Sequence, residues 1–130
     1  MLDKVKFWLD LADDDVPVAK IMLNEKKYLY AGFFCHLIAE KALKAMVASV
    51  TANIPPKIHD LAKLAVHGGI FDELTEQQHK LLKNLSPLQI EARYPENKER
   101  LARKLTPEIS ECLFKETEEF LCWIKKKLEK

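Results

Sequence analysis

The side chains best suited to chemistry gather in three clusters, and the first is a polar stripe within an apolar segment. His36, Glu40 and Lys44 stand four residues apart, which on a helix places all three within about 80° of one another. The structural interpretation is a satisfied network, because Glu40 and Lys44 form a favourable ion pair at this spacing. The functional interpretation is a groove lining or a partner surface, since unpaired buried charge is costly. A metal would need a third ligand that the sequence does not supply, so we expect neither a metal nor a cofactor.

The other two clusters combine a histidine with an acid and an arginine with an aromatic ring. His59 stands beside Asp60, and a histidine next to a carboxylate is the arrangement that general base chemistry uses. The structural interpretation of Asp60 is an acid in the first turn of a helix. Arg93 and Tyr94 precede Pro95, and they suit phosphate binding and base stacking respectively. Glycine-rich phosphate loops and nucleophile elbows are absent from the sequence.

Helical periodicity accounts for the segments that carry these clusters. Pro17 lies inside the first helix, where we expect a kink or a restart. The segment 28–49 is apolar on nearly every side, which predicts the central and most buried helix. We expect an all-α fold, an up-and-down four-helix bundle with an additional short helix. The first two expected helices are residues 3–23 and 28–49, and a short third helix covers 58–66 before Gly68–Gly69. A fourth helix starts at the Thr75–Gln78 capping box, breaks at Ser86–Pro87 and ends before Pro95. The last helix starts at Thr106–Pro107, and its inner face is expected to carry Ile109, Leu113, Phe120, Ile124 and Leu128.

Composition limits the class of protein and its compartment. The 130 residues predict one domain, residues 1–130, and 48% hydrophobic with 32% charged residues is typical of a soluble globule. A net charge of +1 argues against a protein that holds DNA by bulk charge. Charges interrupt the apolar stretch 31–50, and no secretory signal precedes it, so we expect a cytoplasmic protein without a membrane span. The three cysteines match no metal-ligand spacing and are expected to be reduced and buried.

Read together, these clusters resemble one known family. The order and approximate spacing of the matching segments extend from the first helix to the last. On these segments the sequence resembles the HEPN domain family (higher eukaryote and prokaryote nucleotide-binding). The matching positions are Trp8 and Ala12, then Tyr28–Phe34, Ala39–Ala45, Pro56–Leu61 and Glu91–Pro95.

The resemblance implies a helical bundle of four to five helices that is often a homodimer. Members of the family are commonly encoded beside a minimal nucleotidyltransferase with which they associate, and some pairs act as toxin and antitoxin, the HEPN member being a ribonuclease. That ribonuclease branch uses an arginine separated by four to six residues from a histidine. Arg93 stands at the arginine position, whereas the positions that need histidine carry Lys98, Glu99 and Arg100.

The missing histidine favours a binding protein over an enzyme. RNA cleavage without a metal needs a group that exchanges a proton near neutral pH, and lysine and arginine titrate far above it. The sequence therefore predicts a non-catalytic HEPN domain that pairs with a minimal nucleotidyltransferase and binds a nucleotide or an RNA phosphate. Arg93 would hold the phosphate, Tyr94 would stack, and His59 with Asp60 would close the site. The alternative is a metal-independent single-strand ribonuclease in which His59 or His36 replaces the missing histidine.

The sequence also predicts self-association. Phe7 and Leu11 lie off the main apolar stripe of the first helix, and Trp123 lies beside that of the last. Apolar surface outside the core-facing stripe is typical of a partner interface. We therefore expect a homodimer, with the nucleotidyltransferase as a second protein partner.

Overall fold

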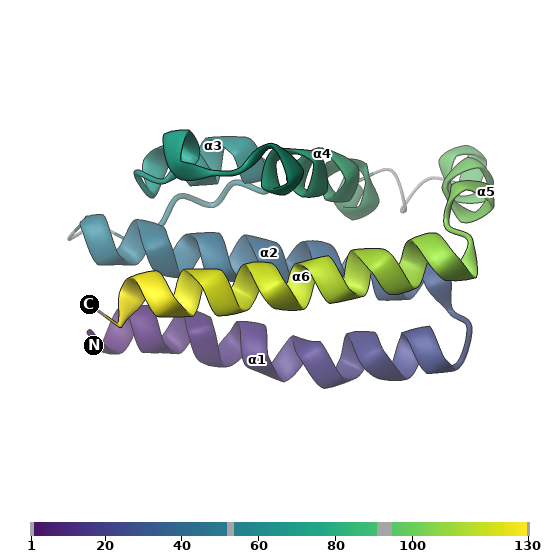
Figure 1. The fold of residues 1–130 in the computed structure, drawn as a ribbon, viewed down its shortest axis with the longest axis horizontal. Coiled ribbons are helices and arrows are strands. Elements are labelled where there is room, and N and C mark those ends of the chain that lie inside the picture. The colour runs from purple at the N-terminus through teal and green to yellow at the C-terminus, as the bar shows by residue number, and fades with distance from the viewer. Residues whose placement is uncertain (1, 52–53, 91–94, 130) are drawn as a thin grey trace.

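The structure is a computed structural model that describes residues 2–51, 54–90 and 95–129. Within these residues it contains six α-helices, one short 3₁₀ helix and no strand. Figure 1 shows their arrangement. The helices are α1 (Asp3–Asn24), α2 (Tyr28–Val50), α3 (Leu61–His67), the 3₁₀ helix η1 (Phe71–Glu73), α4 (Glu76–Ile90), α5 (Pro95–Lys104) and α6 (Pro107–Leu128).

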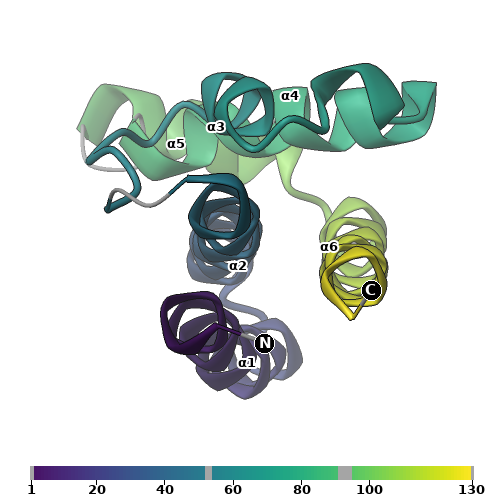
Figure 2. The same cartoon turned by 90° about the vertical axis from the view of Figure 1, so that its left-hand side faces the viewer.

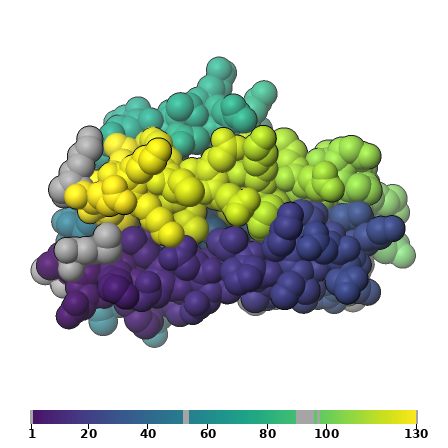
Figure 3. All heavy atoms as spheres, turned by 60° about the horizontal axis from the view of Figure 1, so that its bottom comes forward, coloured from purple at the N-terminus to yellow at the C-terminus, as the bar shows by residue number. Residues whose placement is uncertain are grey.

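Helix α2 lies at the centre of the bundle, with α1 and α6 packed against it on some sides and α3, α4 and α5 on another. The long helices α1, α2 and α6 run side by side along the molecule (Figure 1), and an end-on view shows α3, α4 and α5 above α2 (Figure 2). Helix α2 packs against all five other α-helices. Helix α6 also lies along α1, as the surface in Figure 3 shows. The two chain ends lie at the same end of the bundle (Figure 1). The all-α helical bundle expected from the sequence is confirmed.

Helix α2 forms the core because it is apolar on nearly every side. Every residue from Ala42 to Ala48 is buried, and so are Ala31, Cys35 and Ile38 on earlier turns. Its bounds agree with the expected helix to within one residue at the carboxyl end. Charged residues on the buried part of such a helix must find partners inside the protein.

Side-chain caps define where several helices begin. Thr75 and Gln78 form the expected capping box, in which the Gln78 amide donates to Thr75 Oγ1 at 3.1 Å and the Thr75 amide donates to Gln78 Oε1 at 2.9 Å. Thr106 caps α6 in the same way through its hydroxyl. After α3 only Gly69 adopts the left-handed conformation, with φ of 75°, while Gly68 stays right-handed.

One expected interruption is absent, because α4 runs through Pro87, where a break was expected. Helix α1 also continues through Pro17, without the restart that was expected there as the alternative to a kink. Buried leucines on both sides of Pro87, Leu85 and Leu88, fasten α4 to the core. Their packing outweighs the single backbone hydrogen bond that Pro87 removes.

Two other bounds in this half of the chain also differ from the expectation. Helix α3 begins at Leu61 rather than near residue 58, because Asp60 is its N-cap. Helix α5 was not expected, since Pro95 suggested a helix end. Proline is equally suited to the first turn of a new helix, and buried Leu101 and Leu105 hold α5 against the bundle.

Some side chains lie on the surface against expectation. Ile109 was assigned to the inner face of α6 but is 48% exposed, whereas Phe7, which the sequence placed off the core-facing stripe of α1, is 56% exposed as expected. Cys35 is buried as expected, whereas Cys112 and Cys122 are exposed because they lie on the outer face of α6. Within the described ranges, no helix combines the length and apolarity needed to cross a bilayer.

Candidate functional site

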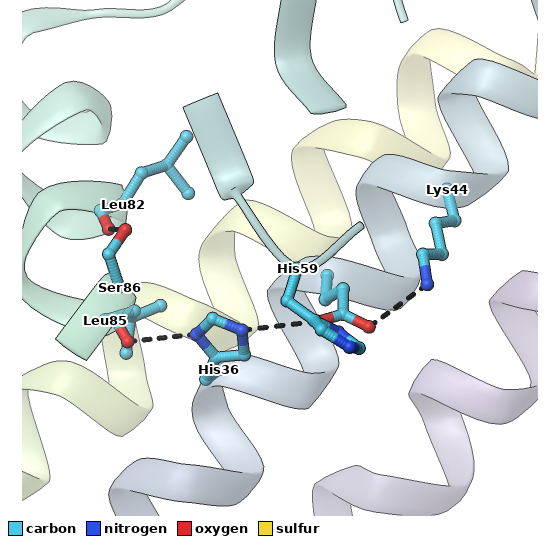
Figure 4. A network of polar contacts seen from close by, with 7 residues as sticks. His36, Lys44, His59, Leu82, Leu85 and Ser86 are labelled. Carbon is cyan, nitrogen blue, oxygen red and sulfur yellow. Dashed lines mark hydrogen bonds and ion pairs between the residues drawn. The ribbon is translucent and has the colours of Figure 1, made fainter. Parts of the chain in front are cut away.

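The structure brings the polar stripe of α2 together with His59, and Glu40 is the residue that joins them. Glu40 Oε1 lies 3.3 Å from His36 Nε2 and 2.9 Å from His59 Nδ1. Its other oxygen, Oε2, accepts a hydrogen bond of 3.2 Å from the Lys44 ammonium. Figure 4 shows the side chains of His36, His59 and Lys44, with dashed lines for the contacts of His36 and Lys44. We call these four residues the Glu40 network.

Two separate segments build the Glu40 network. The four-residue spacing on α2 aligns His36, Glu40 and Lys44 on the side of the helix that faces α4 and the segment before α3. His59 comes from that segment, immediately before the N-cap of α3. Asp60 fixes this corner, because its carboxylate accepts a hydrogen bond of 3.1 Å from the Lys63 amide. The N-cap of α3 therefore holds His59 next to Glu40.

The network is buried except at its His59 end. His36 is 1% exposed, Glu40 5% and Lys44 7%, whereas the His59 side chain is 51% exposed. Buried charges of opposite sign stabilise a protein only when each also has hydrogen-bond partners. Here Glu40 has three partners, and the Lys44 ammonium additionally lies 5.2 Å from the centre of the Trp8 ring on α1.

These partners keep Glu40 ionised. Burial on its own raises the pKa of the Glu40 carboxyl. The hydrogen bonds from His36 and His59 and the charge of Lys44 outweigh burial, and together they lower the pKa of Glu40 from 4.5 to about 2. Glu40 is therefore a carboxylate throughout the physiological pH range.

His36 connects the network to α4. Its Nδ1 lies 2.9 Å from the Leu85 carbonyl oxygen, and its Nε2 faces the Glu40 carboxylate. Both of these oxygens are acceptors, and a ring nitrogen that carries a proton can donate to either of them. With both nitrogens engaged and the ring buried, His36 has no atom left for a ligand.

His59 is the member of the network that a ligand can reach. Its Nδ1 is bound to Glu40, and the described residues provide no partner for its Nε2. A histidine whose Nδ1 is held by a carboxylate has the orientation that proton transfer at Nε2 requires. The sequence placed His59 beside Asp60, but its carboxylate partner in the structure is Glu40, 19 residues earlier. No local spacing signals that pairing, because it depends on how the segment before α3 folds back over α2.

Two of the residues assigned to a phosphate site lie outside the described residues. Arg93 and Tyr94 belong to the part of the chain between α4 and α5 that the structure does not describe. Their roles stay predictions, as does the direct binding role of Asp60, whose carboxylate is occupied by its cap. Across the described residues, no group of three or more His, Cys, Asp or Glu side chains is placed to hold a metal ion.

Comparison with known families matches residues 5–128 to the HEPN domain, which is nearly the whole chain. The chain belongs to the HEPN domain family. A solved structure described as TT1696 from Thermus thermophilus has the same fold, with a TM-score of 0.80. The two are 21% identical, and the alignment covers 97% of this HEPN domain and 99% of that chain. No curated protein matches the sequence.

Proposed function

We propose that this HEPN domain is a non-catalytic binding protein that pairs with a minimal nucleotidyltransferase and binds a nucleotide or an RNA phosphate. The observation that carries the proposal is the burial of His36, one of the two histidines that the sequence offered as a substitute for the missing one. His36 is 1% exposed and both of its ring nitrogens are engaged, so it has no atom free to reach a substrate. The sequence itself has Lys98, Glu99 and Arg100 where the ribonuclease motif needs histidine.

The proposal gives each residue of the site one task. Arg93 holds a phosphate with its guanidinium, which can donate two parallel hydrogen bonds. Tyr94 stacks on a base, and the exposed part of His59 forms the edge of the site. Asp60 contributes indirectly, because its cap on α3 holds His59 in place.

Nucleotide titrations of the wild type and Arg93→Ala test the ligand half of this proposal. A charged hydrogen bond is worth about 1.5–3 kcal/mol, so Arg93→Ala should weaken binding roughly tenfold or more. Lys126→Ala, which removes an exposed cation on α6, is the matched control and should bind like the wild type. Equal affinity of Arg93→Ala and the wild type contradicts the assignment.

Copurification tests the partner half. The tagged HEPN domain is expressed together with the product of the neighbouring gene, and a nucleotidyltransferase should elute with it in a fixed ratio. A neighbouring gene of another class, or a nucleotidyltransferase that elutes separately, contradicts the pairing.

A specific observation supports ribonuclease activity as a second candidate. The pair of His59 and Glu40 resembles the histidine–carboxylate pair of general base catalysis, because Nδ1 is bound to the carboxylate and Nε2 has no partner among the described residues. In this candidate Arg93 binds the phosphate, and His59 takes a proton from a ribose 2′-hydroxyl. RNA cleavage that disappears in His59→Ala would establish it.

A further inference from the structure

A groove lies between α4, α5 and α6, and the residues of the Glu40 network do not line it. It has a volume of about 930 Å³, which is at the upper end of the range for ligand sites. Its aliphatic floor consists of Leu88 on α4, Leu101 on α5, Leu105 directly after α5 and Leu113 on α6. Ile109 adds a large apolar side chain that is 48% exposed.

The rim of the groove is basic. Lys83 projects from α4, and Arg100, Arg103 and Lys104 project from α5. All four are exposed, and neither Lys83, Arg103 nor Lys104 has an ion pair with a described residue. The one carboxylate on the lining, Glu116, already accepts a hydrogen bond of 2.9 Å from the Cys112 thiol. The groove therefore offers positive charge around an apolar strip.

The shape and lining select one kind of occupant. No sheet edge exists in the described residues to receive an added strand, and none of the groove's described lining residues is aromatic. Aromatic rings are what proline-rich peptides and single-stranded nucleic acids need for docking or stacking. An aliphatic groove between helices is the typical receptor for an amphipathic helix, whose apolar anchors recur every three to four residues. The basic rim requires such a helix to carry acidic side chains beside its anchors.

We propose that the groove between α4, α5 and α6 binds an acidic amphipathic helix of a partner protein. Aliphatic side chains of that helix contact Ile109 and the leucine floor. Its carboxylates pair with Lys83 and Arg103 on opposite sides of the groove. The inference is independent of the proposed phosphate site, which involves other residues.

Fluorescence anisotropy with a designed peptide tests the proposal. The probe is a helix of about 16 residues with leucines at positions i, i+3, i+4 and i+7 and glutamates beside them. It should bind the full chain saturably, and more weakly as salt is raised. A peptide of the same composition in scrambled order, and one with lysine in place of glutamate, should each bind at least tenfold more weakly.

Three variants locate the binding. Lys83→Glu combined with Arg103→Glu should weaken binding tenfold or more, and Ile109→Ser should weaken it at least threefold. Lys80→Glu combined with Lys126→Glu makes the same change in net charge on exposed positions outside the groove, and it should bind within twofold of the wild type. Circular dichroism melts confirm that each variant is folded.

Four outcomes overturn the proposal. The first is the absence of saturable peptide binding up to about 100 μM, and the second is equal affinity of the groove variants and the wild type for the peptide. The third is tighter binding of a short single-stranded RNA at the same residues. The fourth is a change of the protein from dimer to monomer in Lys83→Glu combined with Arg103→Glu, because the occupant would then be a second copy of this chain. Loss of nucleotide binding in Arg93→Ala leaves the groove proposal unaffected, so the two proposals can fail separately.

Discussion

Replacing the Glu40 carboxyl with an amide removes the charge at the centre of the buried network. Glu40→Gln keeps the size of the side chain, so it leaves no cavity, but it removes the only carboxylate that His36 and Lys44 contact among the described residues. The buried Lys44 ammonium then has no counter-charge among the described residues. Breaking a buried ion pair by removing one partner is among the most destabilising kinds of substitution.

The pKa of Glu40 gives the magnitude. A carboxyl whose pKa is about 2 in the folded protein and 4.5 when exposed stabilises the fold by about 3 kcal/mol at neutral pH. Because the pKa is lower in the folded state, this stabilisation is fully present above pH 4.5 and is lost as the pH falls towards 2. For a domain of this size, 3 kcal/mol corresponds to a decrease in Tm of roughly 10 °C.

Urea unfolding at a series of pH values tests this reasoning. At pH 7 the free energy of unfolding of Glu40→Gln should be about 3 kcal/mol below that of the wild type. The difference should shrink steadily between pH 4.5 and pH 2. Glu111→Gln, which changes an exposed carboxyl on α6, is the control and should match the wild type. A loss below about 0.5 kcal/mol at pH 7, the size of an ordinary surface effect, would refute the reasoning.

Three further predictions concern single residues. His59→Ala should lower stability by about 1 kcal/mol, less than Glu40→Gln because His59 is half exposed, as thermal melts would measure; a loss equal to that of Glu40→Gln would contradict this ranking. Arg93→Ala should change the free energy of unfolding by at most about 0.5 kcal/mol, so a large drop in Tm would make Arg93 a structural residue. Native alkylation followed by mass spectrometry should modify Cys112 and Cys122 but spare Cys35, because Cys35 is buried and burial raises its pKa to about 11; rapid modification of Cys35 would contradict the packing of α2.

Much of the fold follows from local patterns in the sequence. The capping box at Thr75 and the Thr106 cap place helix starts correctly, because capping involves residues only three positions apart. The burial of α2 follows from its apolar character on nearly every side. The continuity of α4 through Pro87 does not follow, because tertiary packing of Leu85 and Leu88 decides it.

The candidate site was only partly predictable. The helical period alone groups His36, Glu40 and Lys44, and the structure confirms their contacts. The participation of His59 depends on a contact over 19 residues, across a proline-containing segment whose path has no local signature. The misplacement of Ile109 has a similar origin, because periodicity identifies an apolar position but not whether a neighbouring helix covers it. In this fold a groove lies there.

An RNA cleavage assay tests the central claim, that this HEPN domain binds without catalysing, most directly. The purified full chain is incubated with mixed RNA in the presence of EDTA, beside His59→Ala and Arg93→Ala. The account predicts intact RNA in every sample, with retention of RNA or nucleotide by the wild type and His59→Ala but not by Arg93→Ala. Cleavage by the wild type that is lost in both variants would contradict it and assign the pair of His59 and Glu40 to catalysis.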